Sequence, residues 1–268
     1  MSNRAVKGQS IVQSVSRALE ILEIVARAGM PIGITEIAEA TKLPMPTIHR
    51  LLHTLIASGY VYQTPRRRYA LGTRLISLSR YAGGALGVAL RPLLTKTVEE
   101  LGESVSVAML DQDFARYIAH VPSERSMRMF TEVGNQVSLH ATGVGKAILA
   151  AMPPSQAGKT IDRCELRALT PRTITDPEAL RDHIDLVRER GYAIDDNEHE
   201  VGVCCVAVSV PGDLYLAVSV AAPVGRIDLD TVETHVVPVL QETANSIAQL
   251  LAEERRAAEE ERQAAGIE

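Results

Sequence analysis

The sequence predicts an α+β protein in two parts, a small, basic, mainly helical N-terminal domain and a larger acidic domain built on antiparallel strands. Charge is the first observation: residues 1–80 hold eleven Lys or Arg against four Asp or Glu, a net charge of +7, and the rest of the chain holds 17 against 29, a net charge of −12. The second is pattern, because short amphipathic helical repeats dominate before residue 80 and alternating apolar strands follow residue 103. A basic segment beside an acidic remainder suggests that only the first part faces a polyanion.

The first predicted helix covers residues 14–28, "SVSRALEILEIVARA", and Gly29 follows as its stop. Its expected inward stripe comprises Val15, Leu19, Leu22 and Ala26, with Ala18, Ile21 and Val25 beside it. A short second helix is expected after Pro31 in "GITEIAEATKL", with Thr35 as its N-cap.

The third predicted helix lies in "LPMPTIHRLLHTL", residues 43–55, and begins near Met45 or Pro46 because a proline is tolerated in the first turn. Gly59 is its stop. Its apolar stripe comprises Ile48, Leu51, Leu52 and Leu55, and its opposite edge comprises Thr47, Arg50, His53 and Thr54.

The segment "YVYQTPRRRYALG" alternates aromatic and branched residues around a turn at Thr64-Pro65, which predicts a two-stranded hairpin. Three short helices followed by a small hairpin form the winged helix-turn-helix order. In such a domain the third helix lies in the major groove and the hairpin lies beside the adjacent backbone or minor groove.

The predicted DNA-binding residues are Met45, Thr47, His49, Arg50, His53, Arg66, Arg67 and Arg68. Taken alone, Arg50 is equally compatible with a solvated surface arginine, and the arginine run with an ordinary charged turn. Their joint occurrence in this order, within a segment of net charge +7, favours double-stranded DNA as the partner.

The rest of the chain predicts a connecting helix, a second α+β domain and a tail. The connecting helix loses its pattern at Gly83, Gly84 and Gly87, and a new helix is expected from Arg91. Strands are expected at "SVSVAML", "ARYIAHV", "MRMFTEV", "GVCCVAVSV" and "LYLAVSVAA", and helices at "GVGKAILAAM", from Asp176 to about Arg190 and from Asp230 to about Glu254. The expected boundaries are an N-terminal arm at 1–13, a winged helix-turn-helix domain at 14–73, a linker helix at 74–90, an effector-binding and oligomerisation domain at 91–254 and a charged tail at 255–268.

Several function classes are disfavoured. No apolar run approaches the length of a membrane span and the N-terminus lacks a signal-peptide pattern, so we expect a cytoplasmic protein without a membrane partner. Cys164, Cys204 and Cys205 make no disulfide framework. A P-loop would need Gly at position 140 and Ser or Thr at 147, where the chain has His140 and Ala147. We expect no cofactor.

The order of motifs resembles the IclR family of bacterial transcription regulators, from about Ser14 to Glu254. The resemblance is carried by "SVSRALEILE", "ITEIAEATKLPMPTIHRLLHTLIASGYV", "YALG", "LGESVSVAML", "GNQVSLHATGVGKAILA", "GYAIDDNEHEVGVCCVAVSV" and "AVSVAAP". It implies a winged helix-turn-helix domain, a linker helix and a GAF-like domain that binds an effector. Met45 and Pro46 depart from the family, which often has a basic or small polar pair there.

The resemblance implies an effector pocket lined by Met129, Val137, Gly143, Val144, Asp195, Val203, Cys205, Ser219 and Ala221, the last of which stands where the family often has a second serine. The N-terminus of the helix at residues 142–145 offers free N–H groups that suit a carboxylate, so a small organic acid is the expected effector. Ala221 leaves more apolar room, which favours an acid that is less polar or larger than the smallest keto acids.

The resemblance further implies a homodimer or a dimer of dimers on a palindromic or repeated operator. Repression and activation, the latter through RNA polymerase, are both compatible with the sequence. Other interpretations remain open: Gly143 and Gly145 that serve only tight packing, an assembly domain without a ligand, a small-acid hydrolase that uses Cys205 with His199 or His140, and a metal site at Cys204, Cys205, His199 and Asp195. The last lacks a recognisable ligand spacing, and the apolar neighbours of Cys205 favour an inert thiol, so neither a catalytic nor a metal-binding residue is expected.

Overall fold

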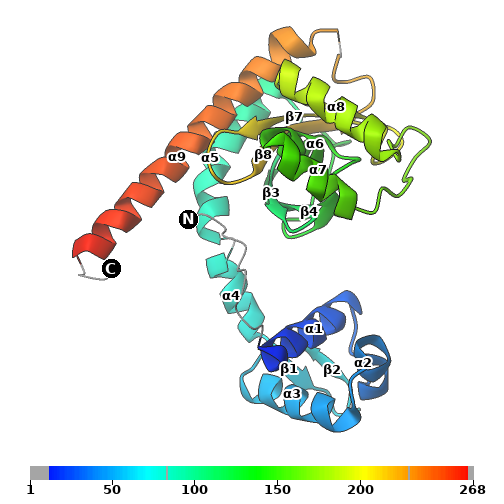
Figure 1. Cartoon of the computed structure of the whole chain (residues 1–268). Coiled ribbons are helices and arrows are strands. Elements are labelled where there is room, and N and C mark those ends of the chain that lie inside the picture. Colours follow the sequence, from blue (N-terminus) through cyan, green and yellow to red (C-terminus); the bar gives the residue numbers. More distant parts are fainter. Residues whose placement is uncertain (1–11, 83, 229, 265–268) are drawn as a thin grey trace. The chain divides into compact units, whose positions relative to one another are not determined.

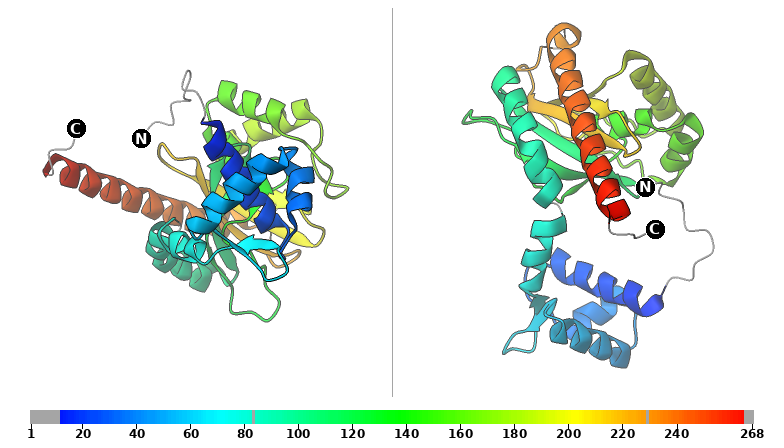
Figure 2. Two further views of the ribbon diagram at one scale, coloured as in Figure 1. Left: turned by 90° about the horizontal axis from the view of Figure 1, so that it is seen from below. Right: turned by 90° about the vertical axis from the view of Figure 1, so that its left-hand side faces the viewer.

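The computed structural model describes residues 12–82, 84–228 and 230–264 (Figures 1 and 2). The chain divides into two compact units, Met1–Ala85 and Leu86–Glu268. The predicted N-terminal arm lies largely outside the described residues.

The N-terminal unit has the predicted order of three helices and a hairpin. Its elements are α1 (Gln13–Arg27), α2 (Ile34–Thr41), α3 (Met45–Ala57), β1 (Val61–Gln63), β2 (Tyr69–Leu71) and α4 (Arg74–Ala82). The hairpin is antiparallel, with Val61 opposite Leu71, and Ile32 forms a bridge to Tyr69 that ties the approach to α2 to the hairpin. The core of the unit comprises Ile21, Val25, Ile32, Ile37, Ile48, Leu52, Leu55, Val61 and Tyr69.

Two local predictions in this unit are wrong. Ile21 and Val25 are buried, whereas Val15 and Leu19 are each 55% exposed, because α1 packs its neighbouring stripe against α2 and α3. Thr35 lies inside α2, whose N-cap is Gly33. The Glu36 carboxylate accepts the Gly33 N–H at 2.7 Å and so provides the cap from within the first turn.

The C-terminal unit is built on one antiparallel sheet in the order β5-β4-β3-β8-β7-β6. Its strands are β3 (Ser104–Asp111), β4 (Phe114–Val121), β5 (Gln136–Ser138), β6 (Ala193–Asp196), β7 (Val203–Val210) and β8 (Leu216–Pro223). Its helices are α5 (Gly84–Leu101), α6 (Gly143–Ala151), α7 (Pro154–Arg163), α8 (Pro177–Arg190), the short π-helix η1 (Val232–Val236) and α9 (Val237–Ala264).

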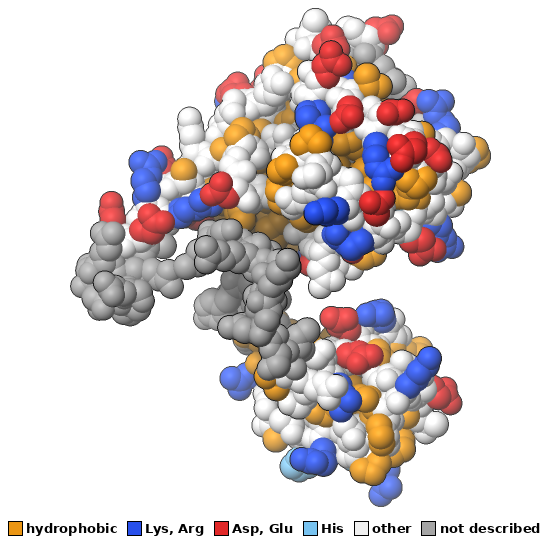
Figure 3. All heavy atoms as spheres, viewed as in Figure 1, with side chains coloured by type: hydrophobic (Ala, Val, Ile, Leu, Met, Phe, Trp, Pro, Cys, Tyr) orange, Lys and Arg blue, Asp and Glu red, His pale blue; other side chains and the backbone are white. Residues whose placement is uncertain are grey.

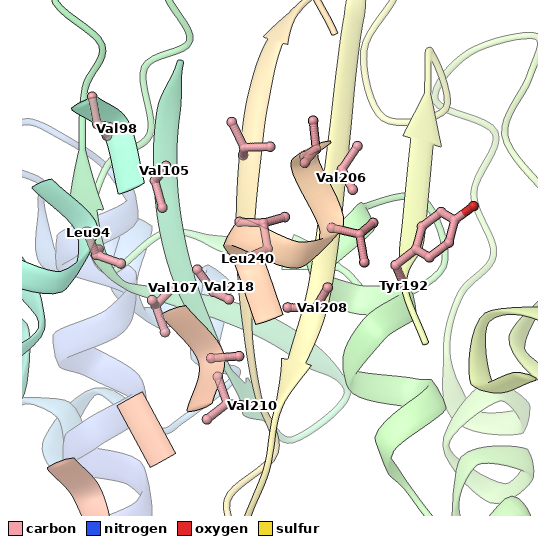
Figure 4. Packing of buried hydrophobic residues seen from close by; sticks show 14 of the residues in the cluster. Leu94, Val98, Val105, Val107, Tyr192, Val206, Val208, Val210, Val218 and Leu240 are labelled. Atoms are coloured by element: carbon pink, nitrogen blue, oxygen red, sulfur yellow. The ribbon is translucent and has the colours of Figure 1, made fainter. Parts of the chain in front are cut away.

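The two faces of this sheet are covered by different helices (Figure 1). On one face α5 and α9 pack against valines of β3, β7 and β8, and Figure 4 shows Leu94 and Leu240 among them. On the other face α6 packs against alanines, including Ala108, Ala207 and Ala217, and α7 and α8 pack against α6. Because side chains alternate along a strand, the bulky and the small residues of each strand separate to opposite faces. The small face leaves room for a pocket.

Several predictions for this unit need correction. Residues 127–133 are not a strand, and the strand in this region is the short β5. The predicted linker helix ends as α4 at Ala82, and α5 then runs through Gly87 and Pro92 without a break, because Leu90 and Leu94 on its other side are buried on the sheet. Sequence reasoning missed α7 and the edge strand β6. The last helix is expected to end near Glu254, with a solvated helical or disordered tail after it, and α9 continues to Ala264.

Candidate functional sites

The polar edge of α3 is exposed. Pro44 is the N-cap residue and Pro46 lies in the first turn, so the helix begins at Met45. Ile48 and Leu52 are buried beneath it. The predicted contact residues of this helix are exposed or, for Thr47, half-buried: Met45, Thr47, His49, Arg50 and His53.

The hairpin lies beside this edge of α3. His49, Arg50 and His53 line one shallow hollow together with Gln63 of β1 and Tyr69 of β2. In Figure 3, blue Lys and Arg side chains and a pale blue His stand out from the surface of the N-terminal unit. Polar side chains of the helix and of the hairpin therefore line the same hollow.

The three arginines of the hairpin point to different surroundings. Arg66 and Arg67 are exposed at the turn, where Arg67 has a left-handed φ of 57°. Arg68 turns toward α2 instead: its Nε donates to Pro31 O at 2.6 Å and its guanidinium pairs with Glu36 at 2.9 Å. The sequence grouped these residues, but the structure separates Arg68 from the other two.

The C-terminal unit holds a pocket of about 440 Å³ on the small-residue face of the sheet. Its lining comprises Tyr117, Met129, Phe130, Thr131, Glu132, Asn135, Gln136, Val137, Thr142, Asp195, His199, Glu200, Val203, Cys205 and Ala221. Six of the nine predicted effector contacts are among them: Met129, Val137, Asp195, Val203, Cys205 and Ala221.

Strand register brings three of these residues into one row. Asp195 of β6 pairs with Cys205 of β7, which pairs with Ala221 of β8. The other three predicted contacts, Gly143, Val144 and Ser219, are buried and are not among the lining residues. Ser219 is buried one pleat along β8, and Val144 is buried in the core.

The N-terminus of α6 meets the pocket at Thr142. Thr142 Oγ1 accepts the Gly145 N–H at 3.1 Å and donates to Ser138 O at 2.7 Å. In the described part of the chain, the N–H groups of Gly143 and Val144 have no acceptor. Such free N–H groups and the helix dipole favour an anion.

Two glycines of α6 have different reasons to lack a side chain. A Cβ on Gly145 would lie 2.4 Å from the Leu139 Cα, so this position requires glycine for packing. A Cβ on Gly143 would lie 3.0 Å from Cys205 Sγ, so a larger residue there would press on the pocket wall.

The polar groups around Asp195 form a connected cluster. Asp195 Oδ1 accepts the N–H groups of Glu198 at 2.8 Å and His199 at 3.2 Å. Behind it, Lys146 donates to Glu198 Oε1 at 2.5 Å and to Ile194 O. Burial raises the pKa of Asp195 and of Glu198, with Lys146 opposing both shifts.

The pocket thiol and phenol are neutral. Burial raises the pKa of Cys205 and of Tyr117 well above their ordinary values. No histidine in the described ranges is hydrogen-bonded to Cys205, and His140 Nε2 instead meets Arg167 O at 3.0 Å. This arrangement offers no activated nucleophile.

Nor do residues 12–82, 84–228 and 230–264 bring three or more His, Cys, Asp or Glu together as a metal site. Within the same ranges, no helix is both long and apolar enough to cross a membrane.

Sequence reasoning missed part of the pocket. Tyr117 reaches it from β4, and Phe130 and Glu132 reach it from the irregular segment before β5. The alternation of "ARYIAHV" placed Tyr117 on a strand but gave no signal for which face of the sheet held the pocket.

Family models of known proteins match both the N-terminal and the C-terminal part of the chain. The family model of the bacterial transcriptional regulator IclR C-terminal domain matches residues 85–249, and that of the IclR helix-turn-helix domain matches residues 14–65. The transcriptional repressor IclR of Escherichia coli strain K12 is 34% identical over 229 residues, which cover 82% of this chain and 84% of the repressor.

Two solved structures extend the comparison. An IclR transcriptional regulator from Alicyclobacillus acidocaldarius matches with a TM-score of 0.77 and 29% identity, over 90% of this chain and 99% of that one. A double mutant of the PobR inducer-binding domain from Acinetobacter, in complex with 3-hydroxybenzoic acid, matches with a TM-score of 0.56 and 25% identity, over 60% of this chain and 97% of that one.

Proposed function

This chain belongs to the IclR family of bacterial transcriptional regulators, with a DNA-binding helix-turn-helix domain, and we propose that a small organic acid in its C-terminal pocket controls operator binding. The observation that carries the proposal is the combination of an exposed basic edge on α3 with a pocket entered by the N-terminus of α6. The relatives are regulators and not enzymes.

On DNA, α3 enters the major groove. Arg50 and His49 reach base edges or phosphates from its exposed edge, and Met45, Thr47 and His53 complete the contact surface. Arg66 and Arg67 at the hairpin turn contact the adjacent backbone. Arg68, whose guanidinium is engaged by Glu36 and Pro31, fastens the hairpin to α2 and acts on DNA through the position of its neighbours.

The protein acts as a homodimer or a dimer of dimers on a palindromic or repeated operator. A groove of about 990 Å³ in the N-terminal unit, lined by α1, α3 and α4, supports this. Its exposed apolar residues include Val15, Leu19 and Leu78. Thr47 and Arg50 line the α3 side of the same groove. A second copy of the unit that covers only its α1 and α4 side would leave them open to DNA and place two α3 helices on two half-sites.

The effector is a small carboxylic acid. Its carboxylate accepts the free N–H groups of Gly143 and Val144, and its body packs against Val137, Val203 and Ala221. The PobR domain complexed with 3-hydroxybenzoic acid supports this ligand class. Because Ala221 brings no hydroxyl, the pocket suits an acid with an apolar body.

The effector acts by differential affinity. An acid that binds one conformation of the C-terminal unit more tightly shifts the population of the whole chain, and the DNA affinity changes by the same coupling free energy. This linkage serves repression or activation, and activation adds RNA polymerase as a partner.

Fluorescence anisotropy on labelled DNA from upstream of the gene tests the proposal, with a panel of keto, sugar and aromatic acids titrated into the complex. The label belongs on the DNA because the chain has no Trp. Arg50→Ala should abolish specific binding, while Arg27→Ala, which removes an exposed arginine paired with Glu23 on α1, should not. DNA binding that no acid in the panel alters would exclude these three kinds of acid as effectors and favour an assembly domain without a ligand.

A further inference from the structure

The charge of the pocket points to a narrower class of effector, an inference that rests on the proposed function. Among its lining residues are three carboxylates, Glu132, Asp195 and Glu200, and neither a lysine nor an arginine. His199 is the one imidazole in that lining, and burial lowers its pKa, so it adds no charge at neutral pH. A plain acid would therefore bring a negative charge to a pocket that already holds negative side chains.

The cation nearest to this cluster is already engaged. Lys146 is 0% exposed, and its ammonium donates to Glu198 and to the backbone carbonyl of Ile194. It compensates Glu198 from behind the pocket wall and is absent from the lining. Glu132 and Glu200 are exposed to solvent, so Asp195 is the buried carboxylate of the lining that lacks a direct positive partner among the described residues.

Asp195 is the best placed of these carboxylates. It is 3% exposed, and its Oδ1 holds the turn that follows β6 through two N–H bonds. In the described part of the chain, Oδ2 has neither a hydrogen-bond nor an ion-pair partner. A carboxylate oxygen without a protein partner, in the wall of a pocket, is an acceptor that a ligand can satisfy. Burial also raises the pKa of Asp195, against the opposing effects of the Glu198 and His199 N–H groups and of Lys146.

Two aromatic rings also line the pocket. Tyr117 lies in the lining near Asp195 and Cys205, and Phe130 is 73% exposed at the mouth. Aromatic faces combined with carboxylates recognise organic ammonium groups. The opposite charge preference exists at the α6 N-terminus, where the free N–H groups of Gly143 and Val144 favour a carboxylate.

We propose that the effector is zwitterionic, an amino-substituted carboxylic acid whose carboxylate binds the N-terminus of α6 and whose ammonium group faces Asp195. The negative group of the ligand then meets the α6 N-terminus, and its positive group meets the Asp195 carboxylate. A plain acid would bind here only if Asp195 took up a proton, and the titrations below distinguish this case from a zwitterion.

Isothermal titration calorimetry on the full-length protein tests the charge class with compounds matched in shape. The trios are hexanoate, 6-aminohexanoate and hexylamine; 3-phenylpropanoate, phenylalanine and 2-phenylethylamine; and 4-ethylbenzoate, 4-(aminomethyl)benzoate and 4-ethylbenzylamine. In at least one trio the zwitterion should bind about tenfold or more tightly than both its acid and its amine, because only it meets both ends of the pocket.

Asp195→Asn isolates the residue. Asparagine keeps an oxygen that accepts the N–H groups of Glu198 and His199, so the turn is retained and only the charge is lost. In this variant the ratio of the zwitterion's affinity to the acid's affinity should fall to about one. Asp196→Asn is the matched control, because Asp196 pairs with Arg172 outside the pocket, and it should keep the advantage.

The outcomes separate this inference from the proposed function. Acids that bind more tightly than their zwitterions overturn the zwitterion and retain a small-acid effector. Proton uptake on binding that is lost in Asp195→Asn would then assign the proton to Asp195. A zwitterion whose advantage survives Asp195→Asn overturns the assigned partner. If no compound of any charge class binds, both this inference and the acid effector are rejected.

Discussion

Lys146 Nζ lies 2.5 Å from Glu198 Oε1, and the two side chains form a buried ion pair between α6 and the turn after β6. The pair joins the helix whose N-terminus meets the pocket to the segment that carries Asp195. It therefore fixes two walls of the pocket relative to each other.

Breaking that pair should destabilise the C-terminal unit strongly. Lys146→Met leaves Glu198 buried without its partner, which costs about 3–5 kcal/mol. Urea unfolding measures the loss, with Lys159→Met on the exposed side of α7 as a control that should unfold like the wild type. The double variant Lys146→Met/Glu198→Gln should recover much of the loss, and a Lys146→Met variant as stable as the wild type would refute the role of the pair.

Asp195→Asn should change the pH dependence of stability. Because burial raises the pKa of Asp195 above its ordinary value of 3.8, the folded protein holds this proton more tightly than the unfolded chain does. The contribution of Asp195 to stability is thus greatest near and below that ordinary value and falls as the pH rises through the folded-state pKa. Without ligand, the variant should be more stable than the wild type at neutral pH, and the difference should vanish as the pH approaches 3.8. Denaturation at a series of pH values measures it, and a pH-independent difference would contradict the assignment.

The three hairpin arginines should differ in how their removal changes the salt dependence of DNA binding. Arg66→Ala and Arg67→Ala should each weaken DNA binding at all sequences and reduce the salt slope by about one, because each removes one phosphate contact. Arg68→Ala should instead lower the stability of the N-terminal unit by about 0.2–1 kcal/mol, as expected for a half-exposed ion pair. Equal salt slopes for Arg66→Ala and the wild type would remove that residue from the DNA contact.

Two glycine substitutions should have opposite effects. Gly145→Ala places a Cβ against the Leu139 backbone. It should destabilise the C-terminal unit by about 1–3 kcal/mol and disturb the pocket entrance. Gly158→Ala in α7, where the nearest atom is Arg181 Nε at 4.0 Å, should stabilise it by up to about 1 kcal/mol. Thermal unfolding compares them, and a stable Gly145→Ala variant would show that α6 can move away from Leu139.

Local chemistry made some elements predictable. Pro44 and Pro46 marked the start of α3, and Asp176, which accepts the Ala179 N–H at 2.8 Å, marked the start of α8. These signals act within one turn of helix and need no tertiary information.

Tertiary contacts explain the errors. The apolar alternation in residues 127–133 predicted a strand, but the backbone carbonyls of Met127 and Met129 accept hydrogen bonds from Arg226 and from Ser104 side chains instead of a strand partner. Thr35 is a good cap residue, yet Glu36 provides the cap to α2 and also holds Arg68, which is 32 residues away in the sequence.

The pocket was predictable in part. Motifs resembling the IclR family located Asp195, Cys205 and Ala221, and the sheet register then explains why these distant residues form one row. Tyr117 and Phe130 escaped because their place at the pocket depends on the fold of the segment between β4 and β5.

The alternation of β7 has a mechanical consequence. Cys205 stands in the wall of the pocket, whereas its covalent neighbours Cys204 and Val206 belong to the cluster that packs under α5 and α9. The wall between the pocket and α9, the longest helix of the described chain, is thus only one β-strand thick. A ligand that displaces Cys205 should therefore also displace Cys204 and Val206, against which α9 packs, because the three residues are covalent neighbours.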